Sequence, residues 1–311
     1  MKIRILPLIL LIFLLTACAA PASPPEQEAA VTFTDALDYE VSLTRWERVV
    51  SLYGSFAEVW LLAGGELTGT TSDAVEERQL ALGENVSIVG TVKEPNLEEI
   101  IAAEPDFVIL AADIAGQADL HEALAAAGIP HAYYRTDTFD EYLAMLAQFC
   151  SLTGRQDLYE QHGLAVRSQI DTVLEAVAGR PAPTALLVRA YSSGAKAKGS
   201  DNLAGVILED LGADNLVSRH ESLLEELSME EIVAADPDFL LITTMGSSDE
   251  AAMAYMAEVF ETNPAWSGLS AVKNGRYLLL PRDLFHYKPN ARWGESYAYL
   301  ANILYPDLSL R

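Results

Sequence analysis

The feature that most constrains the fold is a fifteen-residue segment that occurs twice, 132 positions apart. The first copy runs from Asn96 to Leu110 and the second from Ser228 to Ile242; eight positions are identical and the others keep their chemical type. Each copy is typical of a helix cap, a short helix, a Pro-Asp turn and a buried strand. The chain is therefore expected to build the same kind of lobe twice, and clefts between lobes are common ligand sites.

The segments around the two copies predict the domain organisation. Short apolar runs alternate with helical segments over residues 31–138 and again over 181–311, which indicates two α/β lobes with parallel sheets. Residues 139–180 differ, because their apolar positions follow helical spacing and Gly154 breaks the run. A helix from Arg155 to Ala178 would be roughly 36 Å long at 1.5 Å per residue. We expect this segment to connect the lobes.

The N-terminus has the pattern of an export signal. Lys2 and Arg4 precede a short apolar run that is followed by Leu-Thr-Ala-Cys, ending at Cys18. The run is too short for a membrane span, which needs about 20 residues. The tetrapeptide resembles the lipobox of bacterial lipoproteins, in which the cysteine is acylated. Residues 1–17 are thus a predicted signal peptide and 18–30 a lipid-anchored, Pro-rich tether; an ordinary secretory signal is the alternative.

Composition excludes some partners. The chain has 45 acidic and 20 basic residues, a formal charge of −25, which repels nucleic acid and anionic lipid surfaces. Contact with the membrane is therefore expected through the lipid on Cys18.

Cys150 is the only other cysteine, so no internal disulfide is expected within the exported chain. Cys150 falls in an apolar helical stretch and is interpreted as a buried small residue. We expect a monomer.

The start of each copy predicts a helix N-terminus. Asn96 and Ser228 are good N-caps, and Glu99 and Glu231, three residues later, would complete a capping box. The preceding glutamates, Glu98 and Glu230, are not needed for the cap. As a purely structural contribution, each would favour the helix dipole by about 0.3–1 kcal/mol.

Several further motifs, in this order, resemble a known family. They include Arg48-Val49-Val50-Ser51-Leu52, Asp201-Asn202, and Trp266 followed by Ala271 to Arg276. Together with the two copies they resemble the solute-binding lipoproteins of ABC importers, in the class that carries ferric siderophores, haem and cobalamin. The resemblance implies two Rossmann-like lobes joined by one long helix, with little lobe movement and ligand held between the lobes. It also implies a binding protein rather than an enzyme, with no intrinsic cofactor.

The resemblance also implies partners and location. The protein would deliver its ligand to a membrane permease and ATPase complex from the outer face of the cytoplasmic membrane. Glu98 and Glu230 would dock onto arginines of the permease. Loops after the strands should supply the ligand site, where bases suit an anionic chelate and aromatic rings suit a flat scaffold. The candidate ligand-binding residues are Tyr53, Lys93, Arg135, Arg189, Tyr191, Lys196, Arg282, His286, Tyr287, Arg292 and Trp293.

The sequence is compatible with several ligands and with several other functions. The bases favour a ferric siderophore, with haem and cobalamin as alternatives. A binder of free metal ions would need three or four converging ligands, and the five histidines show no zinc spacing. Ser193 to Lys196 and Ser200 to Asn202 match motifs of penicillin-interacting serine enzymes. They begin only seven residues apart, in and directly after the loop expected from Tyr191 to Ser200, which is the wrong context for such an enzyme. A signalling or adhesive lipoprotein on the same scaffold is a further alternative.

Overall fold

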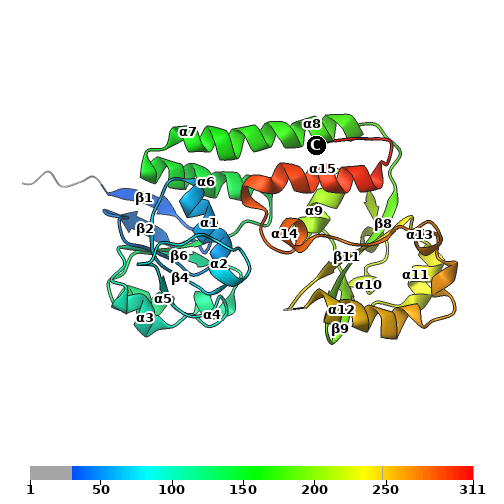
Figure 1. The fold of residues 1–311 in the computed structure, drawn as a ribbon, viewed down its shortest axis with the longest axis horizontal. Helices are drawn as coiled ribbons and strands as arrows, with labels where there is room; N and C mark the ends of the chain where they lie inside the picture. The colour runs from blue at the N-terminus through cyan, green and yellow to red at the C-terminus, as the bar shows by residue number, and fades with distance from the viewer. Residues whose placement is uncertain (1–29, 247, 311) are drawn as a thin grey trace, which may run out of the picture.

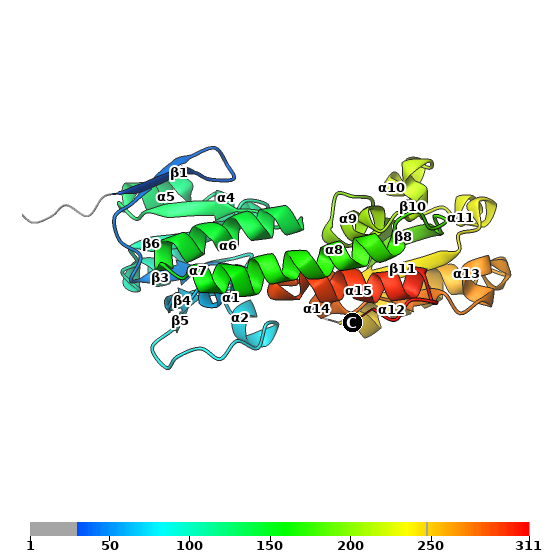
Figure 2. The same cartoon turned by 90° about the horizontal axis from the view of Figure 1, so that it is seen from above.

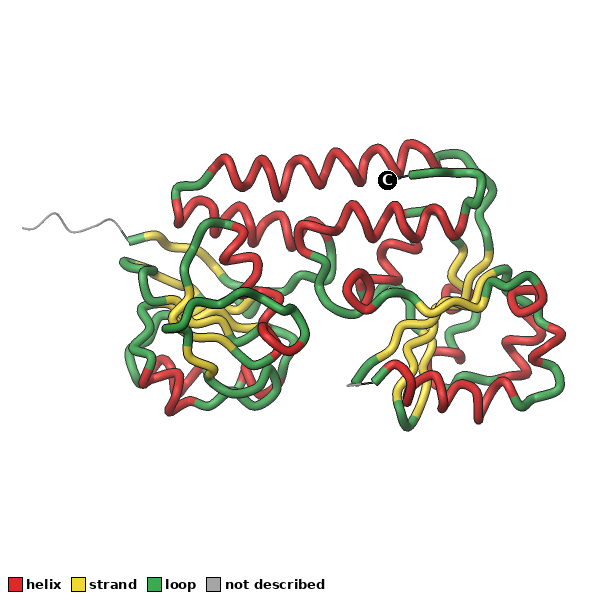
Figure 3. Tube along the Cα trace, viewed as in Figure 1, coloured by secondary structure: helices red, strands yellow, loops and turns green. Residues whose placement is uncertain are grey.

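The computed structural model describes residues 30–246 and 248–310. Within these residues the chain forms two α/β lobes below a shared layer of helices (Figure 1). The strands of each lobe lie between helices (Figure 3). The predicted signal peptide, Cys18 and the tether up to residue 29 lie outside the described residues.

The N-terminal lobe contains a five-stranded parallel sheet in the order β5-β4-β3-β6-β7. Its strands are β3 (Val49–Ser51), β4 (Leu67–Thr70), β5 (Ser87–Ile88), β6 (Phe107–Ala111) and β7 (His131–Tyr134). The helices are α1 (Gly54–Leu62), α2 (Asp73–Glu76), α3 (Leu97–Ala102), α4 (Ala115–Ala118) and α5 (His121–Ala126). An antiparallel hairpin, β1 (Val31–Thr34) and β2 (Glu40–Leu43), precedes them.

The C-terminal lobe repeats this construction. Its parallel strands have the order β10-β8-β11-β12, and β9 pairs antiparallel with β8. The strands are β8 (Thr184–Tyr191), β9 (Gly194–Ala197), β10 (Asp214–Asn215), β11 (Phe239–Thr244) and β12 (Tyr277–Leu279). The helices are α9 (Leu203–Asp210), α10 (Ser222–Glu225), α11 (Met229–Ala235), α12 (Asp249–Met256), α13 (Ser270–Lys273) and α14 (Arg282–Phe285). Short helical turns are η2 (Leu216–Ser218), η3 (Ala257–Glu261), η4 (Trp266–Gly268) and η5 (Asn290–Arg292).

The loop expected from Tyr191 to Ser200 is partly a strand, so that prediction was wrong. Ala195 and Ala197 pack on a hydrophobic cluster below the sheet, whereas Lys196 between them is exposed. This alternation is the period of a strand, but only three residues carry it. The polar and small residues around them hid the signal.

The two sequence copies fold alike. The first forms α3 and β6 and the second forms α11 and β11. The carboxylate of Asp106 accepts hydrogen bonds from the backbone N–H groups of Glu47 and Arg48, at 3.0 and 2.9 Å, just before β3. Asp238 likewise accepts from the N–H of Thr184, at 2.9 Å, where β8 begins. The equivalent aspartate in each lobe therefore binds the start of the equivalent neighbouring strand, β3 in one lobe and β8 in the other.

The N-caps of the two copies are confirmed, but the capping boxes are not. The Asn96 side chain accepts from two N–H groups of α3, and the Ser228 hydroxyl accepts from one of α11. The reciprocal bonds are replaced by other partners. The Asn96 N–H donates to the Val89 carbonyl at 2.8 Å, and the Glu231 carboxylate accepts from the Ser222 hydroxyl at 2.8 Å. These contacts thus replace the reciprocal half of each capping box, while the N-caps themselves are kept.

The shared layer is helical. Helix α6 (Phe139–Thr153) ends at Gly154, whose φ of 71° lies in the left-handed region that glycine accepts readily. Then α7 (Gln156–Tyr159), the π-turn η1 (Glu160–Leu164) and α8 (Ala165–Val177) follow one another without interruption. They form one rod that runs past both lobes, and α15 (Trp293–Leu304) packs along α8 (Figure 2).

One hydrophobic core runs beneath this helical layer through both lobes. It includes Phe56 and Phe149 on the N-terminal side, Leu187 and Leu208 on the C-terminal side, and Trp293 between them. Each sheet has a second, separate cluster on its other face. Because both sheets pack on one continuous core, relative movement of the lobes would open close-packed surface and is disfavoured.

Candidate functional site

The loops after the N-terminal strands are locked in place by buried hydrogen bonds. Asp73 accepts from the Gly54 N–H at 2.8 Å and from the Thr71 hydroxyl at 2.6 Å, which joins the loops after β3 and β4. Burial raises the pKa of the Asp73 carboxyl. A Cβ atom on Gly54 would lie 2.6 Å from the Ala74 nitrogen, so only glycine fits there.

Two further groups define this end of the N-terminal sheet. The half-buried Tyr53 ring packs edge-on against Phe56 at 5.0 Å, and burial raises the pKa of its hydroxyl, which keeps it neutral. The buried Gln117 amide donates to the carbonyls of Leu52 and Val92, at 2.7 and 2.8 Å. The bond to Val92 holds the loop that carries Lys93 against the strand ends.

The C-terminal lobe contributes an arginine without a carboxylate partner. Arg189 in β8 lies opposite Lys196 of β9 and Thr243 of β11. The Arg189 side chain is partly buried and its Nε is fully enclosed with no hydrogen-bond acceptor. Among the described residues its guanidinium forms no ion pair. An enclosed N–H group without an acceptor is costly, so this side chain is well suited to receive an anion.

His286 lies close to this arginine and carries no charge at neutral pH. Burial, followed by the positive charges of Arg282 and Arg189, lowers the pKa of His286 to about 4. Its ring lies 5.0 Å from that of Tyr287. Arg282 is already occupied, because it donates to Asp249 at 2.8 Å and to the Tyr287 hydroxyl at 3.2 Å.

The structure does not bring all the candidate residues to this region. Trp293 is fully buried in the shared core, 6.1 Å from the Phe139 ring, so it offers no face to a ligand. Arg292 lies at the surface and pairs with Asp283 and Glu295 at 2.7 and 2.8 Å. Arg282 was expected in a loop after a strand, but it begins the short helix α14.

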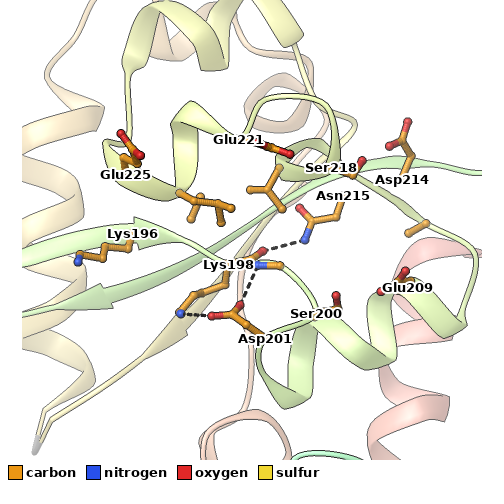
Figure 4. A pocket seen from close by; sticks show the side chains of 16 residues that line it. Lys196, Lys198, Ser200, Asp201, Glu209, Asp214, Asn215, Ser218, Glu221 and Glu225 are labelled. Carbon is orange, nitrogen blue, oxygen red and sulfur yellow. Dashed lines mark hydrogen bonds and ion pairs between the residues drawn. The ribbon is translucent and has the colours of Figure 1, made fainter.

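The remaining candidates have different surroundings. Lys93 and Arg135 are exposed and form no ion pair in the described part of the chain, whereas Tyr191 is half-buried at the end of β8. Lys196 lies at the edge of a pocket of about 780 Å³ within the C-terminal lobe, between β9 and α10 (Figure 4). Lys198, beside it, pairs with Asp201 at 2.6 Å.

Several residues that join the lobes were not among the candidates predicted from the sequence. The segment 286–292, which we call the strap, crosses from the C-terminal lobe to the N-terminal one. Its buried Asn290 donates to the Ser55 carbonyl at 2.9 Å and to the Glu58 carboxylate at 2.6 Å. Asn290 has a φ of 52°, in the left-handed region. A single polar residue in a loop gives no sequence signal for such a contact.

Charged pairs complete the contact of the strap with the N-terminal lobe. Lys288 is buried and pairs with Asp137, and Arg78 pairs with Glu58. The Arg78 guanidinium also donates to the Lys288 carbonyl at 2.8 Å. In the sequence, Arg78 follows two glutamates and is typical of a solvated charge. Only the fold shows that it is enclosed.

Groups from both lobes act on one another electrostatically. Burial raises the pKa of the Glu77 carboxyl, and the positive charges of Arg282 and Lys93 oppose that shift. Arg282 belongs to the C-terminal lobe and Lys93 to the N-terminal one. Glu77 and Arg282, which belong to different lobes, therefore lie close enough to interact electrostatically.

Neither metal-site nor membrane-span features appear in the described ranges. Within residues 30–246 and 248–310, no group of three or more His, Cys, Asp or Glu side chains converges to hold a metal ion. His121 and His131 contact each other at 2.9 Å but lack a third ligand. In the part of the chain that the structure describes, no helix combines the length and apolar character needed to cross a bilayer.

Comparison with known proteins identifies the family. A family model described as periplasmic binding protein matches residues 49–284. The chain therefore belongs to the periplasmic binding protein family, as the sequence resemblance predicted.

Individual relatives share sequence or fold with large parts of this chain. The chain is 27% identical over 197 residues to the Fe(3+)-citrate-binding protein YfmC of Bacillus subtilis (strain 168); the match covers 63% of this chain and 59% of that protein. A periplasmic heme binding protein from Pseudomonas aeruginosa is 24% identical, with a TM-score of 0.68 over 85% of this chain and 95% of that chain. A periplasmic binding protein from Veillonella parvula DSM 2008 is 19% identical, with a TM-score of 0.71 over 91% and 95%. The predicted two-lobed α/β fold is confirmed.

Proposed function

We propose that this protein captures an iron chelate outside the cytoplasm and delivers it to the permease of an ABC importer. The observation that carries this proposal is Arg189: its Nε is enclosed without an acceptor, and its guanidinium has no carboxylate partner among the described residues of this strongly acidic protein. An anionic ligand would complete its hydrogen bonds, and bonds to charged groups contribute about 1.5–3 kcal/mol each.

The neighbouring groups fit an organic anion better than a bare metal ion. Tyr191 and the neutral His286 accompany Arg189 in one lobe, and Tyr53, Lys93 and Arg135 come from the strand ends of the other. Bases and aromatic rings recognise carboxylates and flat scaffolds. Relatives are named for ferric citrate and heme, and a structure of similar fold, with a TM-score of 0.68 and 19% identity, holds ferric iron with two molecules of acinetobactin. A ferric siderophore is our preferred ligand, ahead of haem and cobalamin.

Titration with a panel of ligands tests this assignment. Tryptophan fluorescence of the purified protein would be followed with ferric citrate, a ferric hydroxamate, haem, cyanocobalamin and ferric ion alone. We expect a ferric chelate to bind most tightly, and Arg189→Ala to weaken it about 10- to 100-fold. Arg219→Ala is the matched control, since Arg219 is exposed and pairs with Asp214 in the same lobe. Equal affinity of the wild type and Arg189→Ala would contradict the proposal.

The mode of attachment is proposed from the sequence alone. Acylation of Cys18 would hold the protein at the outer face of the cytoplasmic membrane, because several acyl chains give lasting attachment. Cells supplied with labelled palmitate should label the wild type and not Cys18→Ser. Label retained by the variant would exclude Cys18 as the anchor.

Permease docking is proposed for Glu98 and Glu230. Both lie in the first turn of their helices, α3 and α11, and both are exposed. Neither carboxylate has a hydrogen-bond or ion-pair partner among the described residues. The two helices belong to different lobes, and both lie on the side away from α8 (Figure 1). They are therefore free to pair with two cations of one partner.

A further inference from the structure

The two sequence copies expose the same apolar position. Ile101 in α3 is 44% exposed, and Val233, at the matching position of α11, is 39% exposed. The residue before each, Ile100 and Ile232, is buried in its lobe. Through the fifteen positions, burial of the two copies differs only at the first and fourth. The exposure of Ile101 and Val233 is thus a repeated property of the lobe and not an isolated event.

The fold covers more than half of each of these two residues and leaves the rest at the surface. Single exposed apolar residues are common and need no explanation, but here the same one recurs in both lobes. A β-branched residue forms helix less readily than alanine, because its side chain loses rotamer freedom against the preceding turn. The next residues on each helix, Ala102 and Ala234, are also exposed and use alanine. A contact with a partner therefore explains isoleucine and valine at these two positions better than helix formation does.

Each exposed apolar residue lies beside one of the unpaired glutamates. Ile101 follows Glu98 by three residues, and Val233 follows Glu230 by three, a spacing that places side chains next to each other on a helix surface. Each lobe therefore presents a carboxylate and a branched apolar side chain side by side. We call each such pair a docking patch: Glu98 with Ile101, and Glu230 with Val233.

We propose that the two docking patches bind the permease together, with Ile101 and Val233 supplying the apolar half of each contact. The inference rests on the proposed function in that the partner is the permease. The permease is expected to present, at two equivalent places, a cation beside an apolar surface. Burying the apolar neighbour excludes water from the ion pair, which strengthens it and improves shape selectivity.

Binding to the reconstituted transporter tests the apolar half separately from the charges. The probe is the permease and ATPase complex that supports chelate uptake in the native host, held in lipid nanodiscs. Affinity is measured with and without chelate for the wild type, Ile101→Ser/Val233→Ser, and Leu164→Ser/Val259→Ser as the matched control. Leu164 and Val259 are 45% and 46% exposed and lie outside the two copies. A variant with charge reversal at both Glu98 and Glu230 serves as the reference for a protein that does not dock onto the permease.

The proposal predicts a loss of affinity for the permease of at least tenfold in Ile101→Ser/Val233→Ser, with chelate affinity and melting temperature unchanged. The control pair should bind like the wild type. Wild-type affinity in Ile101→Ser/Val233→Ser, an equal loss in the control, or no binding by the wild type would each overturn the docking patches. Normal permease binding without binding of any chelate would instead overturn the proposed ligand and leave the patches standing.

Discussion

At the scale of single residues, function follows from which charges lack partners. Most Lys and Arg side chains in the described ranges form ion pairs. Examples are Arg282 with Asp249, Lys288 with Asp137 and Arg292 with Glu295. Arg189 is different, because its Nε is enclosed and unpaired. The sequence predicted Arg189 as one candidate among several bases, and no sequence feature set it apart from them. Pairing depends on contacts distant in sequence, so it could not be predicted.

The low pKa of His286 predicts a pH dependence of stability. The imidazole has a pKa of about 4 in the folded protein and about 6.5 when unfolded, so the unfolded chain binds more protons between these values. Its contribution is complete above about pH 6.5 and is lost as the pH falls towards 4. Compared with His286→Gln, the wild type should lose on the order of 2 kcal/mol more between pH 7.5 and 4.5. Urea unfolding measures this; parallel curves would contradict it.

At the scale of elements, local patterns predicted strands and helices well where the segments were long and periodic. The matching copies formed α3 with β6 and α11 with β11 as expected, whereas β9 and α14 were interpreted as loops. Both missed elements are four residues long, too short to show a period. The strap was the larger omission. Its role depends on Ser55 and Glu58, more than 230 positions away.

Asn290 in the strap provides a matched test of this element. Asn290→Gly removes the bonds to Ser55 and Glu58 but accepts the left-handed backbone, and should destabilise by about 1–2 kcal/mol. Asn290→Ala removes the same bonds and also strains the backbone, which should cost about 1 kcal/mol more. Thermal unfolding compares the two variants. Equal melting temperatures would show that the backbone at this position is not strained.

At the scale of the whole molecule, the sequence predicted two lobes and a helical segment connecting them, but the hydrophobic core that the lobes share is evident only in the fold. A single core passes beneath both sheets, and the strap adds polar contacts between the lobes. Amphipathic spacing in residues 139–180 predicted helices there but not which surfaces they cover. We therefore expect ligand to enter with small changes in lobe orientation, because opening would separate packed side chains.

The central claim is that an iron chelate lies between the lobes against Arg189. Crystals grown with the tightest-binding chelate of the panel, with diffraction data recorded at the iron absorption edge, would locate the metal directly. We expect one anomalous peak between the strand ends of the two lobes, with an anionic group of the chelate bonded to the Arg189 guanidinium. A peak confined to the pocket between β9 and α10, or a chelate that leaves Arg189 unpaired, would contradict it.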